Sequence, residues 1–313
     1  MRSAGARYAG RVTLARFLAR PGAAVGLALV VALVALAVLA PVLSSKDPLT
    51  SDVDRGLSAL GAPLPPSSAA PLGTDALGRD VWARVAAAAG TSLSVAGLAT
   101  LLALLLGGAI GLVAGYAGGA LDRALMRLVD LALAFPFVLI AILLAAVLRE
   151  TALAGSNAPV ILTLAAVGWT TMARVIRGKA AALSRREMVI AARAIGASPA
   201  RIVWRHIVPN LRGLVIAMTA LAFAQNLLTE SMLSYLGLGP PPPAPTWGRM
   251  LYEGRAYYRT APHLVLAPGL AIALAVIGFN LLGEALRDTL DRTAPPFGGA
   301  AGRGTPTGEP RER

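Results

Sequence analysis

The chain has 313 residues, of which 56% are hydrophobic and only 14% are charged. Soluble domains carry about 25% charged residues, so this composition excludes an ordinary soluble domain and indicates a polytopic membrane protein. The absence of cysteine excludes disulfides, thiolate chemistry and cysteine metal sites. The net charge of +13 raises nucleic acid binding as a function, but its distribution along the chain argues against that function.

The N-terminal region predicts one transmembrane helix. Residues 1–20 form a basic segment with five arginines and no acidic residue, and residues 21–45 are then uncharged for 25 residues. That length exceeds the roughly 20 residues that cross about 30 Å of hydrocarbon. A cleaved signal peptide has an apolar core of only about 7–15 residues, so a retained helix is favoured over that alternative.

Residues 46–90 are predicted to form a long, mostly polar loop on the outer side. Arg84 and Asp122 then bracket 37 uncharged residues, enough for a second span. Glycines at every fourth position of this span make a flat face on which another helix packs closely, namely Gly107, Gly111 and Gly115. The alternative is that glycine is simply frequent in membrane helices.

Four further apolar stretches complete the predicted helices. We expect spans three to six over Leu131–Leu148, Thr151–Ala173, Gly213–Tyr235 and Thr260–Gly283. Residues 91–285 are thus predicted to form a five-helix core, and the polar tail 286–313 to be partly disordered. The predicted fold class is an all-α membrane protein with six transmembrane helices.

An elbow at residues 185–209 is the longest polar interruption in the apolar second half of the chain. The sequence predicts a short helix over Arg186–Ile195, closed by Gly196, which takes left-handed backbone angles without a Cβ clash. Because this elbow separates the fourth and fifth spans, it is suited to being gripped by another protein.

A second short helix is predicted in the elbow after the glycine turn. Ser198 is expected to cap it, and Pro199 to occupy its first position, where no amide donor is needed. Pro209 is expected to end this helix, because the residue before a proline is biased away from α geometry.

Charge distribution orients the predicted helices. Six spans place both termini on one side, and 21 of the 29 Lys and Arg residues fall on that side, against 8 on the other. The positive-inside rule then makes both termini and the loop 174–212 cytoplasmic. The positive charge is therefore interpreted as a topology signal.

The elbow resembles the permease loop of binding-protein-dependent ABC importers, whose pattern is Glu-Ala-Ala, three residues, Gly, and later Pro. Ala191-Ala192, Gly196 and Pro209 match this spacing, whereas Ile190 stands at the family's Glu and Glu187 lies three positions earlier. Other segments resemble the dipeptide, oligopeptide and nickel branch, closest to its C-type permease, over about residues 20–292: Pro71–Asp75, Gly78–Asp80, Gly118-Gly119, Asp122, Met126-Arg127, Asp130, Ala192–Ser198, Arg205–Asn210, Glu230-Ser231, Leu236–Gly239, Trp247-Gly248, Asn280–Gly283 and Leu286–Asp288.

The resemblance implies a type I ABC importer permease fold in a bacterial inner or plasma membrane. It also implies four kinds of partner: a second permease, two ABC ATPases, an extracytoplasmic solute-binding protein and membrane lipid. No nucleic acid partner is implied. ATP and Mg would bind the ATPases, and this chain would bind no cofactor. Its Gly178-Lys179 pair is followed by Ala180 and lacks the upstream glycine of a phosphate-binding loop. The cargo would be dipeptides, oligopeptides, nickel complexes, glutathione or other small solutes.

The resemblance also assigns an ATPase-coupling role to the elbow, through which ATPase closure would push the adjoining spans. The residues that would carry it are Ala191, Ala192, Arg193, Gly196, Ala197, Ser198, Arg201, Arg205 and Pro209. The alanines would make a smooth contact surface, and the arginines would pair with ATPase carboxylates. The alternative is a basic loop that only fixes topology.

Two further groups of residues have competing interpretations. Glu230 and Asp130 line the translocation path in one hypothesis and are structural carboxylates bonded to neighbouring helices in the other. The outer segment forms either a plug or a binding-protein contact, or else a capped turn that leads into the second span; its residues are Gly73, Thr74, Asp75, Gly78, Arg79 and Asp80. This segment has too few alternating ligands for a calcium loop, and no metal site is predicted.

Two other functions compete with an importer permease that is not itself an enzyme. One is an ion-coupled secondary transporter, which would move solute without an ATPase. The other is a non-transporting membrane scaffold, whose elbow would bind partners without affecting solute flux.

Overall fold

The computed structural model describes residues 20–44 and 46–291. These residues form helices joined by turns, with two isolated β-bridges in the outer loop. Five helices are long and apolar enough to cross a membrane, and a bent helix pair makes a sixth when counted as one span. The predicted all-helical membrane fold is therefore confirmed for the described residues. The arginines before Arg20 and the tail after Asp291 lie outside them.

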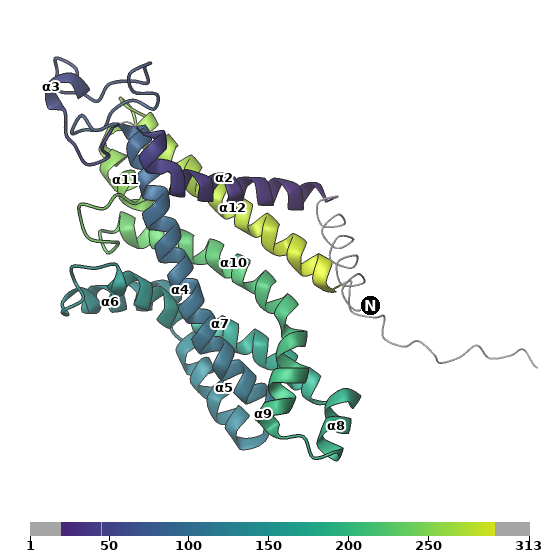
Figure 1. Ribbon diagram of the computed structural model, residues 1–313. Coiled ribbons are helices and arrows are strands. Elements are labelled where there is room, and N and C mark those ends of the chain that lie inside the picture. Colours follow the sequence, from purple (N-terminus) through teal and green to yellow (C-terminus); the bar gives the residue numbers. More distant parts are fainter. Residues whose placement is uncertain (1–19, 45, 292–313) are drawn as a thin grey trace, which may run out of the picture.

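The helices fall in this order along the chain (Figure 1): α2 Pro21–Leu43, α3 Val53–Gly56, α4 Val81–Ala117, α5 Gly119–Leu133, α6 Phe137–Arg149, α7 Ala158–Ser184, α8 Glu187–Ala194, α9 Pro199–Ile202, the π-helical turn η1 Val203–Ile207, α10 Val208–Tyr235, α11 Trp247–Gly254, the 3₁₀ turn η2 Arg255–Tyr257, and α12 His263–Asp291. Figure 1 places the outer loop, α3 and α11 at one end of the molecule and α8 and α9 at the opposite end.

The long helix α4 connects these two ends. Its 37 residues extend for about 55 Å at 1.5 Å per residue, well beyond the hydrocarbon layer. It begins at Val81 because the Asp80 carboxylate caps it, accepting a hydrogen bond of 3.0 Å from the Ala83 amide. The predicted loop 46–90 therefore ends too late, since its last residues are already helical.

Helices α4 and α7 pack closely along the predicted glycine face. A Cβ placed on Gly107, Gly111 or Gly115 would overlap a backbone carbonyl oxygen of α7, that of Trp169, Ala173 or Arg177 respectively. Glycine is therefore required for the spacing of this helix pair, and the interpretation as a helix-packing face is confirmed over the interpretation as incidental glycine.

The third predicted span is broken, which corrects the expectation of one helix over Leu131–Leu148. α5 and α6 meet at an angle of 86°, and Pro136 stands at the break as the cap of α6. Proline has no amide donor and its ring clashes with the preceding turn, so a helix cannot pass straight through this position. The bend leaves the Phe135 side chain exposed.

The predicted fourth and sixth spans are displaced toward their C-terminal ends. Thr151–Ala173 was expected, but α7 runs from Ala158 to Ser184; Thr260–Gly283 was expected, but α12 runs from His263 to Asp291. The first charged residue marks where a helix leaves hydrocarbon, and these helices continue beyond it into the polar region.

Pro209 does not end the second elbow helix, which corrects a further expectation. The chain is helical from Pro199 to Tyr235, and the π-helical turn Val203–Ile207 lies just before the proline. In this turn the Val208 amide bonds the Val203 carbonyl. The wider turn accommodates the missing donor and the ring of Pro209, so the elbow continues into α10 without a loop.

Helices α2, α10 and α12 form the remaining layer. α12 packs against both α10 and α2, and Phe223 stacks on Phe279 with ring centroids 4.0 Å apart. Gly26 and Gly278 bring α2 and α12 close, because a Cβ on either would lie within 3.0 Å of the facing helix. Trp247 at the start of α11 is completely buried in the outer core and donates its indole N–H to the Val85 carbonyl at 3.0 Å.

Candidate functional site

The elbow has the helix–turn–helix form expected from its sequence. α8 ends in two backbone hydrogen bonds of 3.0 Å, from Gly196 N to Arg193 O and from Ala197 N to Ala192 O. Gly196 has φ of +78°, the left-handed conformation that this glycine-closed helix end requires. The Ser198 hydroxyl then caps α9 by accepting from the Arg201 amide at 3.4 Å.

One face of the elbow packs on the chain's own helices. Val189 and Ala192 from α8 are buried together with Ile202 and Ile207, against Ile176 and Leu183 of α7. This placement corrects the expectation for Ala192, which was assigned to the contact surface. Because Ala192 is 6% exposed, it fixes α8 to α7 from the inside, and Ala197 likewise packs against this core.

The opposite face of α8 has no partner within the described part of the chain. Its exposed residues follow helical spacing: Glu187, Ile190, Ala191, Ala194 and Ile195. Ile190 and Ile195 are 56% and 86% exposed, so two large aliphatic side chains lie open on this face of α8. Ile190, the residue that departs from the family pattern, thus adds apolar surface to this face.

The three arginines assigned to the elbow are all exposed. Arg193 lies over the ring of Tyr116 at the end of α4, with its guanidinium carbon 5.2 Å from the ring centroid. This cation–π contact joins α8 to the end of α4. Arg201 and Arg205 lie in α9 and the π-helical turn, so the elbow carries exposed basic charge on both of its short helices.

A cavity of about 340 Å³ lies among α4, α5, α6, α7 and α10. Its walls are apolar except for four uncharged polar side chains: Thr170, Thr171, Gln225 and Asn226. Phe135 and Phe137 line it from the bend between α5 and α6. The Asn226 amide donates to the Thr100 hydroxyl at 2.9 Å, which fixes its orientation in the wall.

Asp130 does not line this cavity. Its carboxylate is exposed and accepts from Arg174 of α7 at 2.6 Å. Nearby, Arg177 binds the Asp122 carboxylate through two nitrogens, with Nε 2.8 Å from Oδ1. Both pairs join α5 to α7, so they hold the first half of the bent pair against the helix that leads into the elbow.

Glu230 does not line the cavity either. It is fully buried in α10, where its carboxylate accepts from the hydroxyls of Ser234 at 2.6 Å and Ser231 at 3.4 Å. Ser92 of α4 accepts from the Trp247 amide at 3.4 Å and also faces this carboxylate. The geometry matches a structural carboxylate that joins α10, α4 and α11.

The outer signature residues form a tightly turned segment in front of α4. Gly73 and Gly78 have φ of +75° and +73°. The Thr74 hydroxyl donates to the Gly56 carbonyl at 2.5 Å and accepts from the Leu64 amide at 2.8 Å. Asp80 caps α4 and also pairs with Lys46 at 3.0 Å. These contacts match the capped-turn hypothesis.

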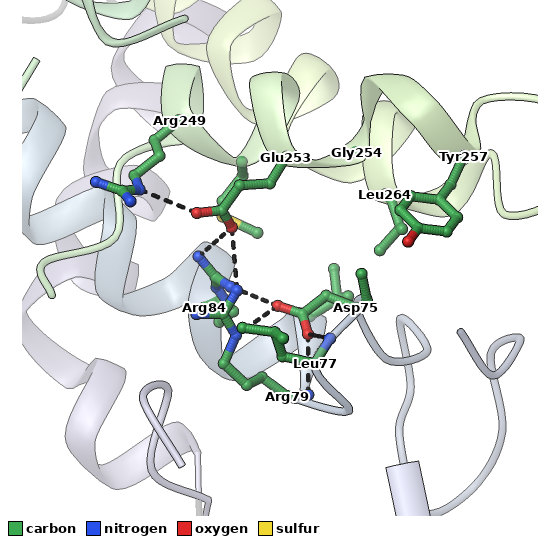
Figure 2. Close-up of a pocket in the computed structure, with 12 residues that line it drawn as sticks. Asp75, Leu77, Arg79, Arg84, Arg249, Glu253, Gly254, Tyr257 and Leu264 are labelled. Carbon is green, nitrogen blue, oxygen red and sulfur yellow. Dashed lines mark hydrogen bonds and ion pairs between the residues drawn. The ribbon is translucent and has the colours of Figure 1, made fainter. Parts of the chain in front are cut away.

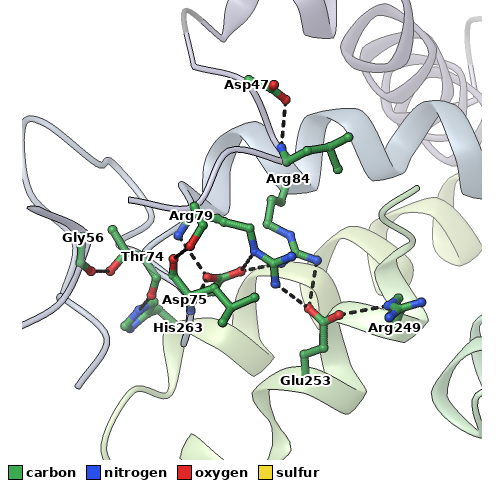
Figure 3. A network of polar contacts seen from close by, with 12 residues as sticks. Asp47, Gly56, Thr74, Asp75, Arg79, Arg84, Arg249, Glu253 and His263 are labelled. Carbon is green, nitrogen blue, oxygen red and sulfur yellow. Dashed lines mark hydrogen bonds and ion pairs between the residues drawn. The ribbon is translucent and has the colours of Figure 1, made fainter. Parts of the chain in front are cut away.

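A charged cluster, which we call the outer clamp, holds this segment onto α11 (Figure 2). Arg79 and Arg84 each contact both Asp75 and Glu253; the Arg79 contacts measure 2.7 and 3.1 Å, and Arg84 lies 2.8 Å from Glu253. Arg249 completes the outer clamp at 2.9 Å from Glu253 (Figure 3). Asp75 and the arginines also line a cavity of about 420 Å³ with Tyr257 and Leu264.

Sequence reasoning missed several of these residues. The stretch after Trp247 was not recognised as a helix, although Thr246 caps it by accepting from the Arg249 amide at 3.2 Å, and so Arg249 and Glu253 were overlooked. The polar residues of the cavity were also missed. Their signal was present as pairs of uncharged polar residues within apolar spans.

Comparison with known proteins places this geometry in context. The family described as "Binding-protein-dependent transport system inner membrane component" matches residues 107–294, and the "N-terminal TM domain of oligopeptide transport permease C" matches residues 9–66.

Several curated proteins match most of the chain. The dipeptide transport system permease protein DppC of Alkalihalophilus pseudofirmus is 36% identical over 269 residues, covering 86% of this chain and 85% of that protein. The oligopeptide transport system permease protein OppC of Bacillus subtilis is 36% identical over 276 residues, covering 88% and 87%. The glutathione transport system permease protein GsiD of Pectobacterium atrosepticum is 38% identical over 226 residues, covering 72% and 73%.

A solved structure shows a similar fold. A chain from the inward-facing MetNI methionine ABC transporter superposes with a TM-score of 0.50 at 16% identity, covering 63% of this chain and 93% of that one. At this identity the similarity supports the helical arrangement alone.

Proposed function

Because the chain belongs to the family of binding-protein-dependent transport system inner membrane components, we propose that it is a permease subunit of an ATP-driven importer for peptides or related small solutes. It forms one half of the pathway beside a second permease. Two ATPase subunits bind ATP and Mg on the cytoplasmic side, and a solute-binding protein delivers cargo from outside. The relatives named for dipeptide, oligopeptide and glutathione transport support this cargo class.

The observation that carries the proposal is the elbow, which joins two walls of the cavity. α7 supplies Thr170 and Thr171 to the cavity and α10 supplies Gln225 and Asn226, and the elbow lies between these two helices in the chain. Its own core fixes one face, whereas the face of Ile190, Ala191 and Ile195 is uncovered. An ATPase that grips this uncovered face would therefore act on both walls.

The cavity lining suits a peptide cargo. Threonine, glutamine and asparagine side chains offer hydrogen bonds to amide groups and carry no charge that would select one cargo side chain. The apolar remainder of the wall tolerates varied side chains. We place the translocation path at this surface and assign Glu230 and Asp130 to structural roles, because neither lines it.

Orientation and the outer contact are further parts of the proposal. We place both termini and the elbow in the cytoplasm, as the charge distribution indicates. The outer clamp and its capped turn then face the extracytoplasmic side, where the solute-binding protein docks. Arg201 and Arg205 are exposed in the second half of the elbow and supply charge for ATPase carboxylates.

The test is a bulky substitution on the uncovered face of α8. Ala191→Trp in the complete importer is expected to reduce co-purification of the ATPases and ATP-driven uptake of a labelled dipeptide or glutathione into proteoliposomes. Ala273→Trp, at an exposed alanine of α12, is the matched control and should retain both. ATPase binding and uptake that survive Ala191→Trp would contradict the coupling role, and uptake by this chain without ATPase would contradict the importer assignment.

A further inference from the structure

An apolar groove of about 690 Å³ runs between α4 and the start of α10, separate from the proposed path and the outer clamp. Its floor and sides are formed by Leu105, Gly108 and Leu112 of α4 and by Val208, Leu211 and Val215 at the other side. Leu105 is 60% exposed. Among the described residues, therefore, this groove lacks the covering that buried apolar side chains usually have.

The groove has a polar character at one end only. Tyr116 and Trp204 line it there, at the end nearest the elbow, and Arg212 follows about two helical turns after Trp204. Helical side chains point back toward the N-terminus of their helix, so the Arg212 side chain is directed toward that end. Trp204 is 70% exposed, and no hydrogen bond or ion pair of the Arg212 side chain occurs within the described residues. Tryptophan and tyrosine favour the membrane–water interface, and an unpaired arginine there attracts anionic lipid headgroups.

The length of the groove fits one leaflet of a bilayer. On α4 its lining runs from Leu104 to Ala117, which is about 20 Å at 1.5 Å per residue. Half of the hydrocarbon layer is about 15 Å thick, so an acyl chain and its glycerol fit this length. A transmembrane helix of a partner would cover the apolar walls, but it would need an acidic side chain to pair with Arg212, whereas an anionic lipid carries that negative charge in its headgroup.

We propose that this groove is a binding site for one anionic phospholipid. An acyl chain lies along Leu105, Gly108 and Leu112, and the headgroup phosphate accepts hydrogen bonds from Arg212, whose side chain extends toward the end that Trp204 marks. Gly108 gives the chain room, because a Cβ there would meet only the side-chain ends of Ile176 and Leu104, at 3.7 and 3.9 Å.

The test uses Trp204 as a reporter in the complete importer, reconstituted in nanodiscs of phosphatidylglycerol and phosphatidylcholine. Total lipid composition stays constant, and only the lipid that carries brominated acyl chains is exchanged. The Trp204 signal is the fluorescence of the unsubstituted importer minus the fluorescence of the Trp204→Phe importer. Brominated phosphatidylglycerol is expected to quench this signal with about five-fold preference over brominated phosphatidylcholine, the effect of one basic residue.

Three variants separate the outcomes. Arg212→Gln should abolish the preference, Arg212→Lys should restore part of it, and Gly108→Leu should lower quenching by both lipids because it fills the groove. Arg127→Gln, at an exposed arginine of α5, should leave the preference unchanged. Equal quenching by both lipids, or a preference that survives Arg212→Gln, overturns the proposal. Absence of quenching by either lipid also overturns it and is the result expected if a protein partner covers the groove.

Discussion

The glycine face of α4 provides a sharp test of how α4 and α7, the most extensively packed pair of described helices, are held together. In Gly111→Ala, the new Cβ would overlap the Ala173 carbonyl oxygen and lie 3.0 Å from the Arg177 amide nitrogen. Ordinary carbon contacts are about 3.5–4.0 Å, so α7 must move away by about 0.5–1 Å. The whole α4–α7 pair shares this spacing, because Gly107 and Gly115 meet the same helix.

Gly108→Ala is the matched control in the same helix. Its Cβ would meet only Ile176 and Leu104, at ordinary distances of 3.7 and 3.9 Å. Both substitutions gain the same helix propensity, about 0.8–1.0 kcal/mol, so this contribution cancels between them. The remaining difference is steric, and overpacking of this kind costs about 1–3 kcal/mol.

The expected result is that Gly111→Ala is less stable than Gly108→Ala by about 1–3 kcal/mol. Reversible unfolding of the purified chain in SDS, followed by circular dichroism, measures this difference directly. Equal unfolding free energies for the two variants would refute the idea that backbone contact sets the α4–α7 spacing.

Three further predictions concern the elbow, the outer clamp and the buried carboxylate. Gly196→Val forces a β-branched residue into φ of +78°, a strain of about 1–3 kcal/mol, and should release the ATPases while the chain stays in the membrane; unaltered ATPase co-purification would oppose this. Glu253→Gln removes the negative charge that pairs with three arginines in the outer clamp and should speed hydrogen exchange in residues 46–80 relative to Glu150→Gln, an exposed control; identical exchange in both variants would argue against a clamp. Glu230→Ala should lower the thermal stability of the chain, since it leaves buried serine hydroxyls without their acceptor at about 1–3 kcal/mol, whereas Glu230→Gln should lose much less. Transport lost in Glu230→Gln at unchanged stability would instead favour a role in the path.

The sequence was most informative where one residue type satisfies one geometric demand. The left-handed turn at Gly196 and the cap at Ser198 were predicted because few other residues suit those positions. The glycine face of α4 was predicted for the same reason. Local backbone requirements of this kind can be read without knowledge of the fold.

The sequence was least informative where two distant segments meet. The prediction at Pro209 failed because the π-helical turn before it relieves the clash, and nothing local distinguishes a helix end from a widened turn. The outer clamp escaped notice because Arg79 and Arg84 lie far from Glu253 in the chain. Only the fold brings these charges together.

The arrangement of the helices explains why an elbow, rather than a flexible loop, joins α7 and α10. The glycine face fixes α4 to α7, and the Asp122–Arg177 pair fixes α5 to α7, so these three helices are expected to move together. α10 packs most extensively on α12 and belongs to the other layer. The elbow is packed on α7 and is continuous with α10 through the π-helical turn. A displacement of the elbow therefore changes the relation between the two layers, and the cavity and the apolar groove both lie along that boundary.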